Sequence, residues 1–340
     1  MNSEQQRRAT RVGPGTPGGN WLRRCWIPAP PSHEVPEAGG APIRVRLLGE
    51  DLIAYRDTEG KVGLVDAYCP HRRAPLFFGR NEECGIRCVY HGWKFDRKGD
   101  CVDMPSEPAG TPLQAKVKLK AYETFEAAGA VWAYMGPKDK VPPKPDFEWM
   151  RVPATHRFVS KTYEACNYLQ GMEGGFDTAH SSFLHNEDIH RPESNLRYRD
   201  RAPSIELENT DYGYHYASIR NVGEGQRYVR LNHYIAPFHQ VRASIKGAPP
   251  ANFSKLDGHI WVPIDDEQTY VWNWMHMPDE AQSLSPAMRD SWEGLLGRAE
   301  SDFIPGTFRL ERNPSNDYLI GRQLQKTRSF SGVAGLNTQD

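Results

Sequence analysis

Cysteine and histidine form two short pairs in the first third of the chain. Cys69-Pro70-His71 is a Cys-x-His pair, and Cys88-Val89-Tyr90-His91 is a Cys-x-x-His pair. Each pair offers one thiolate and one imidazole, so the two together can bind one tetrahedral zinc ion or a 2Fe–2S cluster. In a cluster, Cys69 and Cys88 would hold one iron, and His71 and His91 the other. The tight first spacing favours the cluster, while a structural zinc site stays open as the alternative.

A second group of metal-binding side chains lies near the middle of the chain, where Asn167–His185 contains Asp177, His180 and His185. Asp177 and His180 are three residues apart, so a helix would place them on one face. His180 and His185 are five apart, about 140° around an ideal helix. Both can reach one metal only if the helix ends or distorts between them. Two histidines and a carboxylate with open positions suit a mononuclear Fe(II) that activates O₂.

Composition excludes several classes of protein. The 340 residues include 42 Lys and Arg against 43 Asp and Glu, a net charge of −1 that gives no overall attraction to nucleic acid. No stretch approaches the roughly 18 apolar residues of a membrane span, and the polar N-terminus lacks the apolar segment of a signal peptide. We therefore expect a cytoplasmic protein without disulfides. The cysteines outside the two pairs are expected to be packing residues: Cys25, Cys84, Cys101 and Cys166.

The elements that carry the first group are short. Residues 1–41 are rich in glycine and proline and predict an irregular N-terminal extension. Runs of β type predict a small antiparallel β domain over residues 42–137. These runs are Ile43–Leu48, Leu52–Tyr55, Lys61–Tyr68, Lys116–Leu119 and Ala130–Tyr134. The proline- and lysine-rich stretch Gly136–Pro145 predicts a linker.

Residues 138–340 mix helix and strand patterns. Tyr163–His185 can hold a helix, and alternating residues in 212–220, 228–234 and 270–276 predict strands. A turn is expected at Asp265–Glu267, and Ser285-Pro286 predicts the start of a helix that runs toward Arg298. The predicted fold class is α+β with an antiparallel sheet.

The residues around the Cys and His pairs resemble a known family. Cys69-Pro70-His71-Arg72 and the run Cys88–Phe95 are similar to the Rieske domain of aromatic ring-hydroxylating oxygenases, and Gly13–Thr16 and Asp103–Glu107 resemble the same family. The chain looks closest to the phthalate 4,5-dioxygenase-like branch, whose oxygenase has a single kind of subunit. The resemblance implies an ISP-type Rieske 2Fe–2S domain followed by a helix-grip catalytic domain, and it argues against zinc.

The resemblance also implies roles for the second group. His180 and His185 match the two histidine ligands of the catalytic iron. Asp177 matches the carboxylate that bridges His91 of one subunit to His180 of its neighbour, which implies a cyclic homo-oligomer, a trimer. The third ligand matches Asp340 in the Gln339-Asp340 pair, with Asp317 as the fallback. Members of this branch continue past the pair, so a truncated C-terminus with Asp340 at a frayed end is expected.

The function that the resemblance implies is the oxygenase component of a Rieske non-haem iron system. A separate reductase, of flavin and ferredoxin type, would supply electrons from NAD(P)H, since no Gly-x-Gly-x-x-Gly follows a strand here. The substrate would be a small aromatic molecule, with a carboxylated, phthalate-like compound as one option, hydroxylated with O₂.

Other functions stay open at this stage. Monooxygenation, including O-demethylation of an aromatic ether, is the alternative, and a Rieske electron carrier or a zinc-stabilised binding module fits less well. Arg220, Arg230 and Arg242 lie in strand-like segments and are candidates to clamp an aromatic carboxylate. The sequence names neither the substrate nor the number of oxygen atoms inserted.

Overall fold

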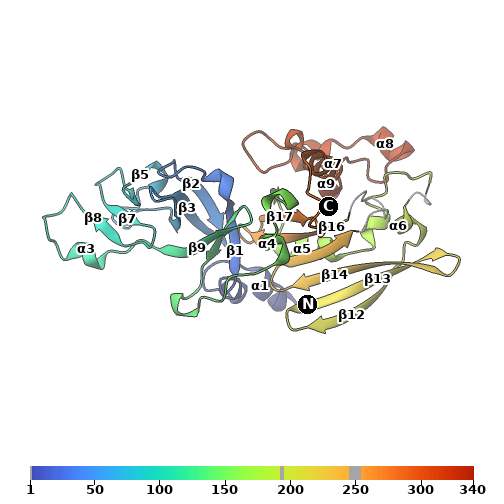
Figure 1. The fold of residues 1–340 in the computed structure, drawn as a ribbon, viewed down its shortest axis with the longest axis horizontal. Coiled ribbons are helices and arrows are strands. Elements are labelled where there is room, and N and C mark those ends of the chain that lie inside the picture. Colours follow the sequence, from blue (N-terminus) through green and yellow to red (C-terminus); the bar gives the residue numbers. More distant parts are fainter. Residues whose placement is uncertain (1, 192–194, 245–253) are drawn as a thin grey trace. The chain divides into compact units, whose positions relative to one another are not determined.

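The computed structural model describes residues 2–191, 195–244 and 254–340, which form two compact units (Figure 1). The first unit runs to Met150 and adds Val262–Glu267, and the second comprises Arg151–Trp261 and Gln268–Asp340. The division after Met150 falls later than the predicted boundary at residue 137. Among the described residues, no helix combines the length and apolar character needed to cross a bilayer.

The N-terminal segment is more regular than predicted. It contains α1 (Ser3–Thr10), α2 (Pro17–Leu22) and β1 (Trp26–Pro31). The Asn2 side chain accepts hydrogen bonds from two backbone N–H groups of α1, and the Thr16 hydroxyl accepts one from Gly19 at the start of α2. Because these caps satisfy the free donors of each first turn, short helices form in a segment that its glycine and proline content predicted to be irregular.

The first unit is built on antiparallel strands. A six-stranded sheet has the order β1-β10-β9-β4-β3-β2. Its remaining strands are β2 (Ile43–Leu47), β3 (Glu50–Arg56), β4 (Val62–Asp66), β9 (Ala121–Ala127) and β10 (Ala130–Tyr134). A smaller sheet, β5-β6-β7-β8, lies away from β1 within this unit (Figure 1). It consists of β5 (Arg80–Glu82), β6 (Gly85–Arg87), β7 (Lys94–Asp96) and β8 (Cys101–Asp103).

One predicted strand of this unit is wrong. Lys116 ends the short helix α3 (Leu113–Lys116), and the segment after it contributes only an isolated bridge between Asp100 and Lys118. Leu119 is buried in the core under the small sheet, so its apolar character reflects packing from a loop.

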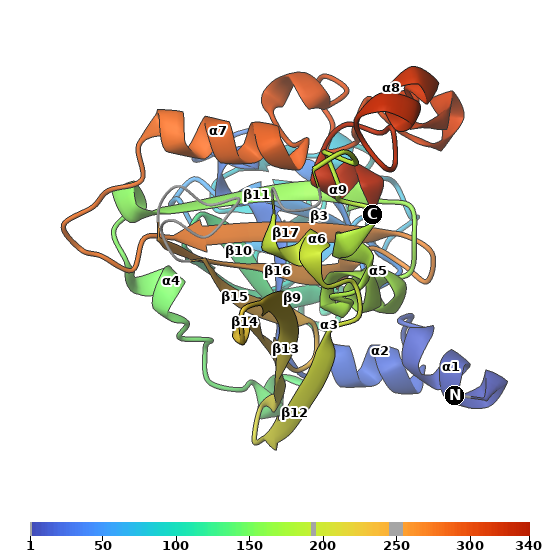
Figure 2. The same ribbon diagram turned by 90° about the vertical axis from the view of Figure 1, so that its right-hand side faces the viewer.

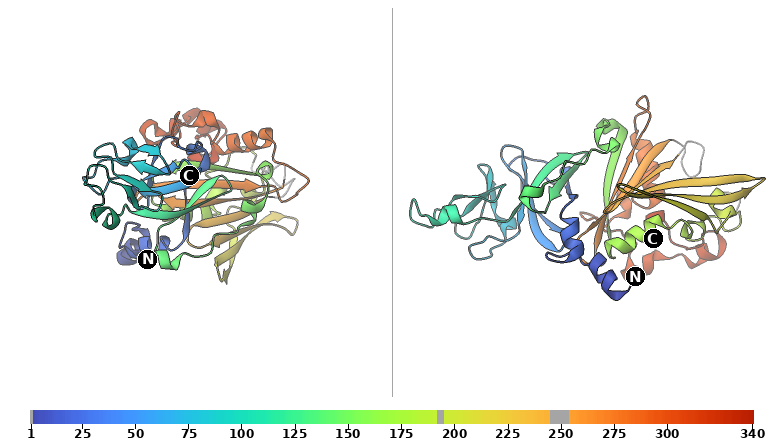
Figure 3. Two further views of the ribbon diagram at one scale, coloured as in Figure 1. Left: turned by 60° about the vertical axis from the view of Figure 1, so that its left-hand side comes forward. Right: turned by 90° about the horizontal axis from the view of Figure 1, so that it is seen from below.

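The second unit contains a seven-stranded sheet in the order β11-β17-β16-β15-β14-β13-β12. Its strands are β11 (Arg157–Glu164), β12 (Ser204–Thr210), β13 (Gly213–Gly223), β14 (Gln226–Ile235), β15 (His239–Ser244), β16 (Lys255–Pro263) and β17 (Thr269–His276). The long strands β13 and β14 run side by side (Figure 3). All three predicted strand regions of this unit are confirmed, and so is the α+β class with antiparallel sheets.

The second unit also contains helices, of which α7 lies along the β11 edge of the sheet (Figure 2). They are α5 (Tyr168–Phe176), α6 (Leu196–Arg199), α7 (Pro286–Leu296), α8 (Arg322–Thr327) and α9 (Leu336–Gln339), while α4 (Glu148–Arg151) spans the division between the units. The start of α7 is as predicted, because the Ser285 hydroxyl accepts from the Met288 N–H and Pro286 occupies the first turn. Gly297, with φ 75°, ends this helix in the left-handed conformation that glycine adopts without strain.

Candidate metal centres

The two Cys and His pairs occupy two tight turns of the first unit. In the first turn the Arg73 N–H donates to the Cys69 carbonyl, and in the second the Gly92 N–H donates to the Cys88 carbonyl. Gly92 has φ 78°, and a Cβ there would lie 2.7 Å from Pro105 Cγ. A side chain at residue 92 is therefore excluded twice, by conformation and by space.

The four side chains divide into a thiol side and an imidazole side. Cys69 and Cys88 are 1% and 3% exposed, and both thiols are free. Burial, together with the adjacent Cys88 thiol, raises the pKa of Cys69 to about 11. The rings of His71 and His91 lie 4.4 Å apart between centroids, and the His71 ring stacks on Trp93 at 4.3 Å.

This arrangement suits a two-iron cluster better than one zinc ion. His71 Nδ1 is buried and has no hydrogen-bond partner, as expected for a nitrogen that ligates a metal. A 2Fe–2S cluster with two Cys on one iron and two His on the other matches the division into a thiol side and an imidazole side.

The second group of ligands follows directly after α5. Asn167 caps the helix by accepting from the Leu169 N–H, and Asp177 ends it with an extended ψ of 128°. The chain then makes one 3₁₀ turn at His180–Ser182. The helix therefore ends before His180, which is the condition under which His180 and His185 can face one metal. It also means that Asp177 and His180 meet across a turn rather than along a helix face.

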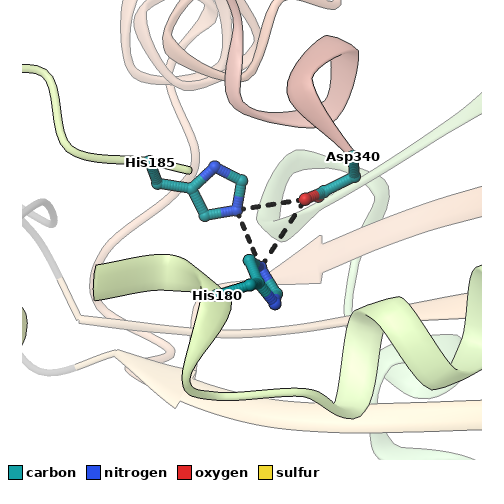
Figure 4. Close-up of side chains that lie close together, drawn as sticks. All are labelled: His180, His185 and Asp340. Carbon is teal, nitrogen blue, oxygen red and sulfur yellow. Dashed lines mark hydrogen bonds and ion pairs between the residues drawn. The ribbon is translucent and has the colours of Figure 1, made fainter. Parts of the chain in front are cut away.

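The three candidate ligands point at one another (Figure 4). His180 Nε2 lies 3.1 Å from His185 Nε2, and Asp340 Oδ1 lies 3.3 Å from His185 Nε2 and 3.6 Å from His180 Nε2. Two ligand atoms bound at about 2.1 Å and at right angles to each other are about 3.0 Å apart. The spacing therefore fits three ligands on one face of a metal ion, with the opposite face open.

Hydrogen bonds fix which ring nitrogen of each histidine faces this centre. The Gln339 amide N–H donates to Glu187 Oε1 and to the Val333 carbonyl, both at 2.7 Å. Its Oε1 must then accept from His185 Nδ1, 2.8 Å away. His180 Nδ1 lies 3.3 Å from Asp177 Oδ2, and burial lowers the pKa of His180. In the neutral tautomers that these bonds select, the two Nε2 atoms carry no proton and face each other, an arrangement that a cation between them stabilises.

Asp340 is carried by α9, which packs against α7. The contact is close because two glycines meet: a Cβ on Gly335 would lie 2.7 Å from Gly297 Cα. The structure does not bring the fallback residue, Asp317, to the histidines, since it lies exposed in the 3₁₀ segment Pro314–Leu319.

A cavity of about 270 Å³ adjoins the three ligands and combines aromatic, acidic and basic side chains. Arg230 and Arg242 line it as predicted, and so does Arg197, which the sequence analysis missed. The charge of Arg197 and then burial lower the pKa of Arg230 to about 9. Buried Arg197 Nε has no hydrogen-bond partner. Unpaired guanidinium groups that repel each other in a cavity make a binding site for an anion.

The prediction that Arg220 lines the pocket is wrong. This residue is fully buried, and its guanidinium donates to the Thr178 carbonyl at 2.6 Å and to the Asp200 carbonyl at 3.1 Å. It therefore supports the turn between Asp177 and His180 from behind and does not line the cavity. The alternation of β13 placed its side chain on a buried face but could not tell which neighbour it would meet.

Comparisons with known proteins agree with both centres. Two family models match: the Rieske 2Fe-2S domain over residues 25–123, and the LigXa C-terminal domain like family over residues 133–340. The phthalate 4,5-dioxygenase oxygenase subunit of Pseudomonas putida is 37% identical over 100% of this chain and 78% of its own. The 3-chlorobenzoate-3,4-dioxygenase oxygenase subunit of Comamonas testosteroni is 38% identical over 97% and 78%. The structure of dicamba monooxygenase matches with a TM-score of 0.62 at 20% identity, over 80% of this chain and 82% of that one, which supports the fold alone.

Proposed function

This chain belongs to the Rieske non-haem iron oxygenases of the phthalate 4,5-dioxygenase type, and we propose that it is an oxygenase component acting on a carboxylated aromatic compound. It is an enzyme whose cofactors are a Rieske 2Fe–2S cluster and Fe(II). The LigXa C-terminal match after the Rieske domain argues against a simple electron carrier, and the Rieske match argues against a zinc-stabilised module.

The observation that carries the proposal is the convergence of His180 Nε2, His185 Nε2 and Asp340 Oδ1 within 3.1–3.6 Å beside a cavity. We assign these three residues to the mononuclear iron, and Cys69, His71, Cys88 and His91 to the cluster. When bound, the iron supplies O₂ activation and the cluster supplies electrons one at a time. The protein orients the imidazoles so that Nε2 of each faces the centre, through Gln339 for His185 and Asp177 for His180.

The cavity supports an anionic substrate. Arg197, Arg230 and Arg242 line it, and no ion pair of Arg197 or Arg230 is formed within the described residues. The aromatic rings of Trp261 and Trp292 line the same space and offer apolar surface to a substrate ring. A carboxylate held by guanidinium groups would place the ring beside the iron ligands, with hydroxylation at the ring position nearest the open face.

Electrons are proposed to reach the iron through Asp177 across a subunit boundary. The Asp177 side chain is 49% exposed although it contacts an iron ligand, His180, on its other side. An exposed carboxylate in that position is free to accept a hydrogen bond from His91 of a neighbouring subunit, and we propose that this contact forms in the cyclic trimer that the resemblance implies. We propose a separate reductase that takes electrons from NAD(P)H in the cytoplasm. The phthalate and 3-chlorobenzoate relatives are each named as an oxygenase subunit, a name that implies a further component.

Spectroscopy of the anaerobically purified protein tests the assignment of both centres. We expect visible absorption and an EPR signal from a reduced Rieske cluster, with acid-labile sulfide and additional iron that is lost in the His185→Ala variant. Zinc in place of iron would overturn the assignment. Product analysis with phthalate, 3-chlorobenzoate and their neutral amides, in the presence of a phthalate-type reductase and NADH, tests the substrate class.

Co-expression of two inactive variants tests the electron route. Cys88→Ser disables the cluster and His185→Ala disables the iron site, each in its own subunit. If electrons cross between subunits, mixed oligomers will regain part of the activity, because a subunit with an intact cluster can serve a neighbour with an intact iron site. Absence of recovery in verified mixed oligomers would refute the route.

A further inference from the structure

A row of hydrogen-bonded polar side chains crosses four neighbouring strands of the seven-stranded sheet. It runs from Thr162 on β11 through Asn273 on β17 and His259 on β16 to Arg242 on β15, which borders the cavity. Thr162 is 3% exposed, Asn273 3% and His259 8%. Figure 2 shows these strands side by side in this order. Polar groups at this depth in a sheet must be hydrogen-bonded to one another or they destabilise the fold.

The guanidinium group of Arg242 can only donate, and this fixes the direction of each hydrogen bond along this row of side chains. Arg242 Nη2 lies 2.9 Å from His259 Nε2, and since arginine has no acceptor, His259 Nε2 must accept. The proton of the neutral imidazole is then on Nδ1, which donates to Asn273 Oδ1 at 2.8 Å. Asn273 Nδ2 in turn donates to Thr162 Oγ1 at 3.2 Å. The Asn273 oxygen therefore selects the tautomer of His259 that can accept from Arg242.

Arg242 is held on a second side as well. Its Nε donates to Asp257 Oδ1 at 3.0 Å, and the other oxygen of Asp257 pairs with buried Lys255. Nε and one Nη2 hydrogen are thus committed to the protein. The other three N–H groups of the guanidinium have no partner within the described residues, and Arg242 lines the cavity that also contains Asp340.

We propose that Asn273 and His259 are positioning residues that set the affinity of Arg242 for the anionic group of the substrate. This inference rests on the proposed function, in which a carboxylated aromatic compound binds beside the iron. His259 fixes the plane of the guanidinium from one edge while Asp257 fixes it from another, so the free N–H groups are presented in one orientation. A guanidinium restrained in this way loses less conformational entropy when a carboxylate binds.

Replacement of the Asn273 oxygen tests the role. In Asn273→Leu, a side chain of similar volume, His259 Nδ1–H loses its acceptor. The ring then either leaves a buried donor unpaired or changes tautomer, and in the second case Nε2–H opposes the Arg242 N–H. In the first case nothing holds the ring in the orientation that points Nε2 at Arg242, and in the second case Nε2 no longer accepts from it. Arg242 therefore loses its restraint in both, and we expect phthalate to bind about tenfold or more weakly. Binding of the uncharged phthalamide should stay within about twofold, because it does not depend on charge pairing with Arg242.

Two variants serve as controls in this experiment. Asn273→Asp keeps an acceptor oxygen facing His259 and should retain most of the wild-type preference for phthalate at pH 8. Thr162→Val removes a hydroxyl from the far end of this row of side chains without changing the contacts of His259. It should also leave the preference for phthalate unchanged. His259→Phe removes the acceptor for Arg242 directly and should reproduce the loss if Asn273→Leu fails to fold.

Calorimetric titration of the iron-loaded protein without reductase separates the possible results. If Arg242→Gln leaves the preference for phthalate over phthalamide intact, then Arg242 does not hold the carboxylate and the positioning role is refuted, while the proposed function still stands on Arg197 and Arg230. If the wild-type protein itself shows no such preference, then the proposed substrate class is wrong. If Arg242→Gln abolishes the preference while Asn273→Leu and His259→Phe both retain it, then the proposed function stands and the positioning role is refuted. Equal loss of both ligands in Asn273→Leu would also refute it, because it would indicate a general structural defect.

Discussion

Two adjacent glycines in α5 allow a sharp test of how the proposed iron ligands are positioned. A Cβ on Gly175 would lie 2.3 Å from Cζ2 of Trp261, which is 3% exposed and belongs to the inner strand β16. A Cβ on Gly174 would meet nothing within 4 Å. The Gly175 carbonyl also accepts from the Gln240 amide at 2.7 Å, which ties this turn of the helix to β15. Gly175→Ala and Gly174→Ala therefore make the same chemical change in one helix with opposite packing consequences.

The expected magnitudes follow from the two environments. Gly174→Ala should stabilise the protein by up to about 1 kcal/mol, since alanine restricts the unfolded chain and favours helix. Gly175→Ala gains the same amount but must displace α5 or the buried ring of Trp261, which costs about 1–3 kcal/mol. The two variants should differ by that packing cost. For a domain of this size, we expect a separation of about 2–12 °C between their unfolding midpoints.

The displacement of α5 should also appear at the metal. Asp177 and His180 follow α5 directly, so a shift of the helix moves one ligand relative to His185 and Asp340. Thermal unfolding by circular dichroism and iron analysis of the two alanine variants provide the measurements. Equal midpoints and equal iron content for Gly174→Ala and Gly175→Ala would refute the claim that contact with Trp261 positions α5.

Three further predictions concern single hydrogen bonds or ion pairs. Gln339→Leu should weaken iron binding about 10- to 100-fold, measured by chelator competition, with the visible spectrum of the cluster unchanged, because His185 loses the acceptor that fixes its tautomer. Asp177→Asn should keep both metals by iron analysis but lose nearly all coupled product formation, and full activity would refute the bridging role. Glu50→Gln should destabilise the first unit by about 3 kcal/mol in urea unfolding at pH 7, since it leaves buried Arg23 without its partner. Burial raises the pKa of Glu50, but hydrogen bonds from Lys120, Tyr122 and Arg23 outweigh it, and the pKa is lowered below the ordinary 4.5. The wild-type advantage should therefore be present above pH 4.5 and disappear as the pH falls through the lowered value.

The sequence was most informative where the chemistry is local. Cys69 and His71, or Cys88 and His91, are separated by one or two residues, so each tight turn defines half of a site without reference to the rest of the chain. The requirement that the helix end between the paired histidines was also visible, because five residues do not fit one helix face. The N-terminal helices were missed, since their caps depend on single residues, such as Asn2, in a stretch whose composition favours turns.

Contacts between side chains on neighbouring strands could not be predicted from the sequence. Arg242, His259 and Asn273 lie on three different strands, and their contact depends on the strand order β15-β16-β17 and on register. Alternation identifies a buried face but not the neighbour that a side chain meets on it, which is why Arg220 was assigned to the pocket. The assignment of Asp340 as a ligand came only from the resemblance, because no local spacing connects it to His185.

One turn of chain near Asp340 performs two tasks at the proposed iron site. Gln339 selects the tautomer of His185, and its neighbour Asp340 offers the third of the proposed ligand atoms, 3.3 Å from the nitrogen that this choice exposes. On the other side of the site, Asp177 contacts His180 and also ends the helix that carries it. The two residues that orient the histidines, Gln339 and Asp177, thus belong to the same backbone segments that position the proposed ligands. The site therefore depends on the docking of α9 and α5 as much as on the three ligand side chains.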